Sequence, residues 1–130
     1  MKKELVRKCE MEKIKCILIN KQKKITHWQG DVFEGEIYDN SGILKPEIAG
    51  FLRYIIHDGS VELRQIFVDP EFRQKKLGTA LVNDLFKIAR KSHRDKVLII
   101  SNAAEDEPFG AFCTKMGFQM TKPKTWEYEL

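Results

Sequence analysis

A basic cluster, Arg73, Lys75 and Lys76, lies directly before Gly78 and holds the residues of this chain best suited to binding an anion. The cluster joins an apolar, strand-like run at residues 61–68 to an amphipathic run with helical spacing. Cations at the start of a helix are disfavoured by its dipole, whereas free backbone N–H groups there bind phosphate. The pattern therefore indicates an anion site, with Gly78 allowing the ligand to approach the backbone closely. A solvated basic loop is the alternative, and the residue order of a Walker loop is missing.

The elements that must position this cluster alternate between strands and helices. The apolar patterns predict strands at residues 3–9, 30–42, 48–56, 61–68, 97–100 and 125–130, the last as a strand or hairpin. Helical spacing predicts helices at residues 10–24, 77–89 and 109–116. The uninterrupted apolar run at 97–100 is typical of a strand in the parallel middle of a sheet. The predicted fold class is therefore α/β, a mixed central β-sheet flanked by helices.

The length and composition bound the class of protein. A chain of 130 residues, 42% apolar and 32% charged, predicts a single globular domain over residues 1–130. The net charge of +4 fits an anionic ligand but does not by itself indicate nucleic acid. Cys9, Cys16 and Cys113 form no CxxC pair, so neither a disulfide framework nor a metal site is expected. Without a signal peptide or a membrane-length apolar run, we expect a cytoplasmic protein with no membrane partner.

The segment VELRQIFVDPEFRQKKLGTALV, residues 61–82, resembles the acetyl-CoA-binding motif of the GNAT superfamily of N-acetyltransferases. That motif is a strand, an Asp-Pro-like turn and an Arg/Gln-x-x-Gly-x-Gly/Ala loop that enters a helix. Arg73 matches the first position of the loop and Gly78 its last glycine. The segment AFCTKMGF, residues 111–118, resembles the next motif of the family, commonly Ala-Phe-Tyr-x-Lys-x-Gly-Phe. The likeness covers about residues 48–118, over half of the chain.

The resemblance implies the GNAT acetyltransferase fold, with the sheet splayed beside residues 61–68 to bind acetyl-CoA. The pantetheine arm is expected against backbone groups at Ile66, Phe67 and Val68. Its amide is expected near Asn102, for which a helix-cap or turn role is the alternative. The pyrophosphate is expected at a run of basic and backbone groups, namely Arg73 and the N–H groups of Gln74, Lys75, Lys76, Leu77, Gly78 and Thr79.

The implied reaction passes the acetyl group directly from acetyl-CoA to a primary amine, which must lose a proton to become a nucleophile. Glu62 is the expected general base, because it lies eleven residues before Arg73, the spacing of the glutamate in the histone-acetylating branch. Strand alternation predicts that Glu62 shares a face with Arg64, Ile66 and Val68. By resemblance, the backbone N–H of Val68 holds the oxyanion. The alternative is that Glu62 faces solvent and forms an ion pair with a basic side chain.

Two positions depart from the family pattern. Lys76 replaces the first loop glycine, so its side chain must point away from the phosphates or contact them. Cys113 replaces a frequent tyrosine, a general acid, and can act as a proton donor or as a small apolar residue on a packed helix face. The CoA thiolate is a good leaving group, so a dedicated general acid to protonate it can be dispensable. His57 and Asp58, in a turn, are weaker candidates for the base.

Two other functions remain open. One is a CoA-binding protein of this fold without catalysis. The other is a small basic nucleic-acid-binding domain. It is less favoured, because the basic side chains cluster at one helix entrance and form no stripe with exposed aromatics. The expected partners are acetyl-CoA and an amine-bearing small molecule or protein, with no nucleic acid. An exposed last strand would permit a homodimer.

Overall fold

The computed structural model describes residues 14–29, 41, 45–73, 76–100 and 107–130. Within these residues, seven strands form one mixed sheet in the order β2-β1-β3-β4-β5-β7-β6. The strands are β1 (Ile14–Asn20), β2 (Ile25–Gln29), β3 (Ile48–Ile56), β4 (Ser60–Val68), β5 (Lys96–Ile100), β6 (Gln119–Lys122) and β7 (Thr125–Glu129). The helices are α3 (Leu77–Lys91), α4 (Glu107–Lys115) and a short 3-10 helix, η1 (Pro70–Phe72). The strands predicted at residues 3–9 and 30–42 lie outside the described residues, except for residue 41.

The helix predicted over residues 10–24 is wrong, because residues 14–29 form the antiparallel hairpin of β1 and β2. The spacing of Ile14, Ile17 and Leu18 imitated a helix, but residues 16–19 are all buried. An uninterrupted buried run rich in isoleucine is typical of a strand covered on both faces. The turn is closed by the Oδ1 atom of Asn20, which accepts hydrogen bonds of 2.9 Å from two backbone N–H groups of the turn.

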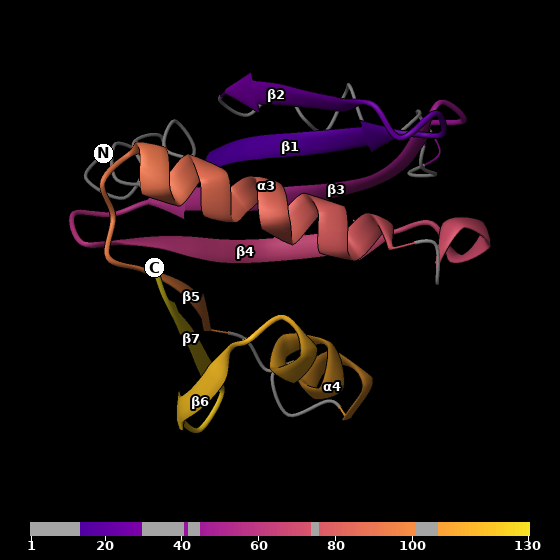
Figure 1. Ribbon diagram of the computed structural model, residues 1–130. Helices are drawn as coiled ribbons and strands as arrows, with labels where there is room; N and C mark the ends of the chain where they lie inside the picture. Colours follow the sequence, from indigo (N-terminus) through magenta and orange to yellow (C-terminus); the bar gives the residue numbers. More distant parts are fainter. Residues whose placement is uncertain (1–13, 30–40, 42–44, 74–75, 101–106) are drawn as a thin grey trace, which may run out of the picture.

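The predictions from residue 48 onward are confirmed as elements. β3 and β4 form the expected hairpin, and β5 pairs with β4 in parallel in the middle of the sheet. The predicted helices at 77–89 and 109–116 correspond to α3 and α4, and the chain ends in the β6–β7 hairpin. α3 lies across one face of β1, β3 and β4 (Figure 1). Its buried side chains carry the main core, namely Leu77, Leu81, Val82, Leu85, Phe86 and Ala89.

The sheet splays between β4 and β5. Their parallel pairing runs from Ser60 opposite Lys96 to Leu63 opposite Ile99, and no further. The rest of β4 continues to Val68, while β5 and β7 turn away from its direction (Figure 1). One edge of the second half of β4 is therefore turned toward the space left by this divergence.

β4 also contains a bulge at Arg64. The pairing of β3 with β4 shifts by one residue there, so that Arg64 is an extra residue on the β4 side. Leu63 before the bulge, and Ile66 and Val68 after it, all pack against the core beneath α3. The prediction that Glu62 shares a face with Ile66 and Val68 is therefore wrong: the bulge reverses the alternation, and Glu62 lies on the opposite face.

Candidate functional site

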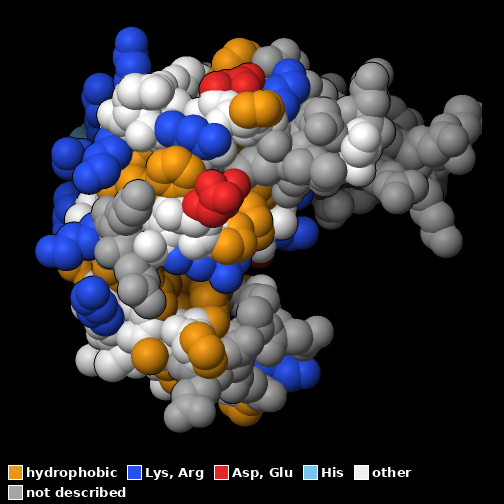
Figure 2. Space-filling model, turned by 90° about the vertical axis from the view of Figure 1, so that its right-hand side faces the viewer, with side chains coloured by type: hydrophobic (Ala, Val, Ile, Leu, Met, Phe, Trp, Pro, Cys, Tyr) orange, Lys and Arg blue, Asp and Glu red, His pale blue; other side chains and the backbone are white. Residues whose placement is uncertain are grey.

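A cavity of about 660 Å³ lies where the sheet splays. The end of β4, the start of α3 and one side of α4 form its walls. Figure 2 faces this end of the sheet and shows hydrophobic side chains in a hollow, with Lys and Arg side chains nearby. The lining residues are Ile66, Phe67, Val68, Phe72, Arg73, Lys76, Leu77, Gly78, Thr79, Pro108, Phe109, Phe112 and Lys115. An apolar cavity with a few polar and charged groups is the usual form of a small-molecule site.

The start of α3 presents backbone N–H groups to this cavity. Lys76, at the N-cap, has a left-handed conformation with φ of 63°, and no side chain of the described residues caps the helix. The first intrahelical bond is donated by the N–H of Ala80 to the carbonyl of Lys76, over 3.0 Å. The N–H groups of residues 77–79 precede that bond, and these residues line the cavity. Such a helix start is suited to an anion.

The end of β4 presents its backbone to the same space. The N–H of Asp69 donates to the carbonyl of Ala49 over 2.8 Å, which makes these two residues a hydrogen-bonded pair. Bonded and non-bonded pairs alternate, so the N–H and C=O groups of Val68 point away from β3, as do those of Ile66. Consistent with this, the Nε atom of Arg73 donates to the carbonyl of Val68 over 2.9 Å.

Among the described residues, three cationic side chains line the cavity, those of Arg73, Lys76 and Lys115. The guanidinium of Arg73 lies 5.7 Å from the centre of the Phe67 ring. Lys115, on α4, was missed as a site residue in the sequence, although it stands in the family-like segment 111–118. Its position one helical turn after Phe112 is the signal that could have identified it, because one side of that helix faces the cavity.

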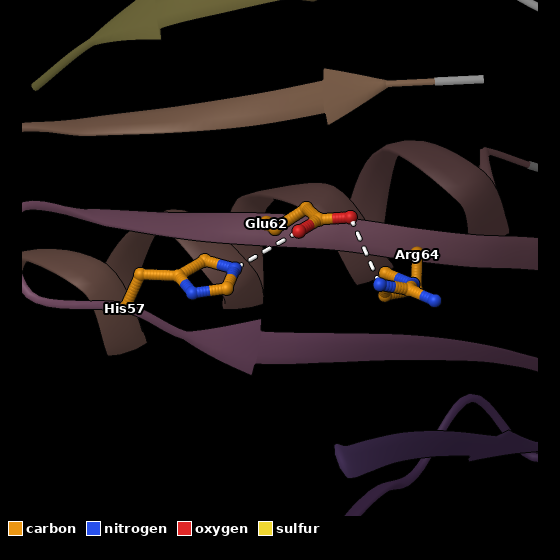
Figure 3. A network of polar contacts seen from close by, with 3 residues as sticks. All are labelled: His57, Glu62 and Arg64. Atoms are coloured by element: carbon orange, nitrogen blue, oxygen red, sulfur yellow. Dashed lines mark hydrogen bonds and ion pairs between the residues drawn. The ribbon is translucent and has the colours of Figure 1, made fainter. Parts of the chain in front are cut away.

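Glu62 is held between His57 and Arg64 (Figure 3). One carboxylate oxygen lies 2.9 Å from the Nε2 atom of His57 and the other lies 3.4 Å from a guanidinium nitrogen of Arg64. The side chain of Glu62 is 14% exposed, and it is not among the residues that line the cavity. The structure thus brings together Glu62 and His57, which the sequence offered as separate bases, and it gives Glu62 the partners that the alternative interpretation expected.

Cys113 is fully buried in the core beside α3 and does not line the cavity. Burial raises the pKa of the Cys113 thiol from 9.0 to about 11. Both observations favour the interpretation of Cys113 as a packing residue. The remaining predicted site residues, Gln74, Lys75 and Asn102, lie outside the described residues.

In the described ranges, no three His, Cys, Asp or Glu side chains are grouped so that they could hold a metal ion. No helix in those ranges has the length and the apolar character needed to cross a membrane.

The chain is similar in sequence to known acetyltransferases. The sequence profile described as the acetyltransferase (GNAT) family matches residues 9–118, most of the chain. Over 58 residues, 45% of the chain, the sequence is 34% identical to an uncharacterized N-acetyltransferase of Methanocaldococcus jannaschii. That stretch spans only 25% of the relative's length.

Solved structures share the fold. An acetyltransferase of the GNAT family from Staphylococcus aureus has a TM-score of 0.59 at 18% identity, over 72% of this chain and 64% of that one. The PaiA N-acetyltransferase of Thermoplasma acidophilum, solved in complex with coenzyme A, has a TM-score of 0.58 at 22% identity, over 65% of this chain and 55% of that one. The chain thus spans less than two thirds of these proteins, and the likeness at this identity concerns the fold.

Proposed function

This chain belongs to the acetyltransferase (GNAT) family, and on that premise we propose that it transfers the acetyl group of acetyl-CoA to a primary amine. The observation that carries the proposal is the cavity at the splay of β4 and β5. It joins a helix start that no described side chain caps, an outward-facing strand edge and cationic side chains, three features that suit the parts of a CoA molecule. The family and the coenzyme A complex of a relative with the same fold support the choice of ligand.

The residues of the cavity fit CoA along its length. The backbone N–H groups of residues 77–79 would bind the pyrophosphate, with Arg73, Lys76 and Lys115 adding positive charge. The N–H and C=O groups of Ile66 and the C=O of Val68, directed away from β3, would hydrogen-bond the amides of the pantetheine arm. Bound in this way, acetyl-CoA supplies a thioester whose carbonyl carbon an amine can attack.

The chain's own groups would then act on the proton and the developing charge. Glu62 would take the proton from the acceptor ammonium before attack, with His57 holding its carboxylate in place. The N–H of Val68 would stabilise the oxyanion, since it faces the open edge of β4. The amine nitrogen forms the new bond to the carbonyl carbon, the C–S bond breaks, and the nitrogen loses its second proton to water as the amide forms. The thiolate leaves without a dedicated acid, because the Cys113 thiol is buried away from the cavity.

Thermal unfolding in the presence of ligands tests the binding step. Acetyl-CoA at a hundred times its Kd should stabilise the protein by about 2.7 kcal/mol, and so raise the Tm by several degrees. Pantetheine, which lacks the nucleotide and the phosphates, should raise it far less, because the helix start and the cations have nothing to bind. Equal rises for the two ligands would contradict the proposed phosphate site.

A second function, CoA binding without catalysis, is favoured by one observation. Both carboxylate oxygens of Glu62 have cationic or ring-nitrogen partners, and Glu62 does not line the cavity. Release of free CoA thiol in the presence of small amines, polyamines and lysine peptides separates the two functions. An enzyme releases CoA in proportion to the amine added, whereas a binding protein gives no release above the rate without protein.

A further inference from the structure

Gly50 of β3 lies against the part of β4 that lines the cavity. A Cβ atom at this position would be 2.7 Å from the carbonyl oxygen of Phe67 and 3.4 Å from both the Cα and a methyl group of Val68. Contacts of 2.7 Å are shorter than a real Cβ tolerates, and the atom in the way belongs to the backbone. Any side chain at residue 50 would therefore move the end of β4.

The need for glycine here is one of space, since Gly50 is not among the described glycines with positive φ. Gly50 lies directly opposite Val68 in the register of β3 and β4. This is a non-hydrogen-bonded pair, the kind in which antiparallel backbones come closest. The pairing of β3 with β1 also shifts next to Gly50, between Ile19 and Asn20, so the strand is irregular at this point.

A second glycine also lies near the Val68 side chain. A Cβ atom at Gly78, in the first turn of α3, would be 3.9 Å from the same methyl group of Val68 and 3.5 Å from the ring of Phe112. The same methyl group of Val68 thus lies near a glycine of β3 and a glycine of α3. Movement of Val68 would therefore alter its contact with the start of α3 and the wall that it contributes to the cavity.

We propose that Gly50 is a positioning residue for the acetyl donor: it lets β4 approach β3, and this approach sets the width of the cavity and the direction of the Val68 backbone groups. The inference rests on the proposed function of the cavity as the acetyl-CoA site. Gly50 itself touches no ligand. It acts through Phe67 and Val68, and the outward-facing backbone groups of Val68 would align the pantetheine arm.

The test compares Gly50→Ala with Gly59→Ala, a matched control because a Cβ at Gly59 would meet nothing within 4 Å. Affinities for CoA and for adenosine 3′,5′-bisphosphate are measured by calorimetry in folded protein. Gly50→Ala should weaken CoA binding by about tenfold or more, because overpacking at residue 50 displaces the strand end that would hold the pantetheine arm. It should leave binding of the nucleotide fragment unchanged, because that fragment relies on the cationic side chains. Gly59→Ala should bind both ligands as the unaltered protein does.

If Gly50→Ala does not fold, a second pair of variants tests the positioning role. Val68→Ala removes the methyl groups that face residue 50, and Gly50→Ala is then added in that background, where only the Phe67 carbonyl must move. The added change should again weaken CoA binding alone. Unchanged CoA affinity, or equal loss for CoA and the nucleotide fragment, overturns the positioning role and leaves the proposed function intact. An unaltered protein that does not bind CoA overturns both.

Discussion

At the scale of single residues, the partners of Glu62 determine how its chemistry can be tested. His57 and Arg64 each hold one oxygen of the carboxylate, and Arg94 in turn donates from its Nε atom to the carbonyl of His57 over 2.7 Å. A base held in this way has a fixed orientation, which general acid–base catalysis requires. The same contacts would also hold a purely structural carboxylate, so the distinction must come from the dependence of the rate on pH.

Replacing Glu62 with Gln keeps the shape of the side chain and removes the proton acceptor. The rate of acetyl transfer should fall by about 10²–10⁴-fold near neutral pH, the usual effect of losing a general base. At high pH the acceptor amine loses its proton unaided, so the deficit should shrink. A pH–rate profile with a good acceptor measures both effects.

A matched control for this variant is Glu127→Gln on β7, a carboxylate that is paired with Lys96 over 2.9 Å and does not line the cavity. Its rate should stay close to that of the unaltered protein at every pH. A profile of Glu62→Gln that coincides with that of Glu127→Gln would rule out Glu62 as the base.

The sequence could predict many of the residues around the cavity but not how Glu62 is placed. Arg73 and Gly78 were identified because charge and glycine at a helix start have a direct physical meaning. The bulge at Arg64 has no such signal, since an extra residue in one strand is defined only by its pairing with another. A prediction based on alternation therefore placed Glu62 on the wrong face.

At the scale of elements, the start of α3 has an unusual residue at its N-cap. Lys76 has φ of 63°, a conformation that costs a residue with a Cβ about 1–2 kcal/mol and costs glycine nothing. This explains why the family pattern has glycine where this chain has lysine. The lysine contributes a charge beside the cavity, at the expense of backbone strain.

Lys76→Gly should therefore relieve strain and remove a charge at once. We expect a gain in stability of about 0.5 kcal/mol, because the greater freedom of glycine in the unfolded chain offsets part of the relief. CoA affinity at low ionic strength should fall, and the difference should narrow as salt screens the charge. Urea unfolding and CoA titrations at low and high salt measure these two effects.

Lys124→Gly is the control, because Lys124 has the same left-handed conformation, with φ of 64°, in the turn between β6 and β7. It does not line the cavity, so it should show the gain in stability without the loss of affinity. If both variants bind CoA equally at low salt, Lys76 has no part in holding the phosphates.

The elements that the sequence predicted correctly are those with a single consistent pattern. α3 has an apolar stripe at helical spacing along its whole length, and its buried residues follow that stripe. β3 and β4 flank a polar turn that forces a hairpin. β1 could not be predicted in the same way, because a short run buried on both faces has no polar positions to reveal its period.

At the scale of the whole molecule, three buried groups link stability to alkaline pH. Burial raises the pKa of the Cys16 and Cys113 thiols from 9.0 to about 11. It also raises the pKa of the Tyr54 phenol from 10.0 to about 12, with a further contribution from the charge of Asp84. The folded protein therefore holds these protons more tightly than the unfolded chain does.

The free energy of unfolding should not depend on these groups below about pH 9, where the thiols are protonated in both states. It should fall as the pH rises from 9 to 11, because the unfolded chain then releases protons that the folded protein retains. By pH 10 the loss should reach about 1 kcal/mol for each thiol. Urea unfolding at pH 8, 9 and 10 measures it.

The double variant Cys16→Ala with Cys113→Ala isolates the contribution of the thiols. It should be less stable at pH 8, because two buried side chains are shortened, and it should lose less stability between pH 8 and pH 10. An identical slope in both proteins would assign the alkaline loss to other groups.

The short pairing between β4 and β5 would give acetyl-CoA, the proposed acetyl donor, a structural role in the sheet. Four residue pairs, from Ser60 opposite Lys96 to Leu63 opposite Ile99, join the β2-β1-β3-β4 half of the sheet to the β5-β7-β6 half. A pantetheine arm lying along Ile66 and Val68 would occupy the place where that ladder would otherwise continue. While acetyl-CoA is bound, its pantetheine arm would pair with the edge of β4 as a neighbouring strand does. Release of CoA would then break these hydrogen bonds along the edge of β4, and binding of the next acetyl-CoA would form them again.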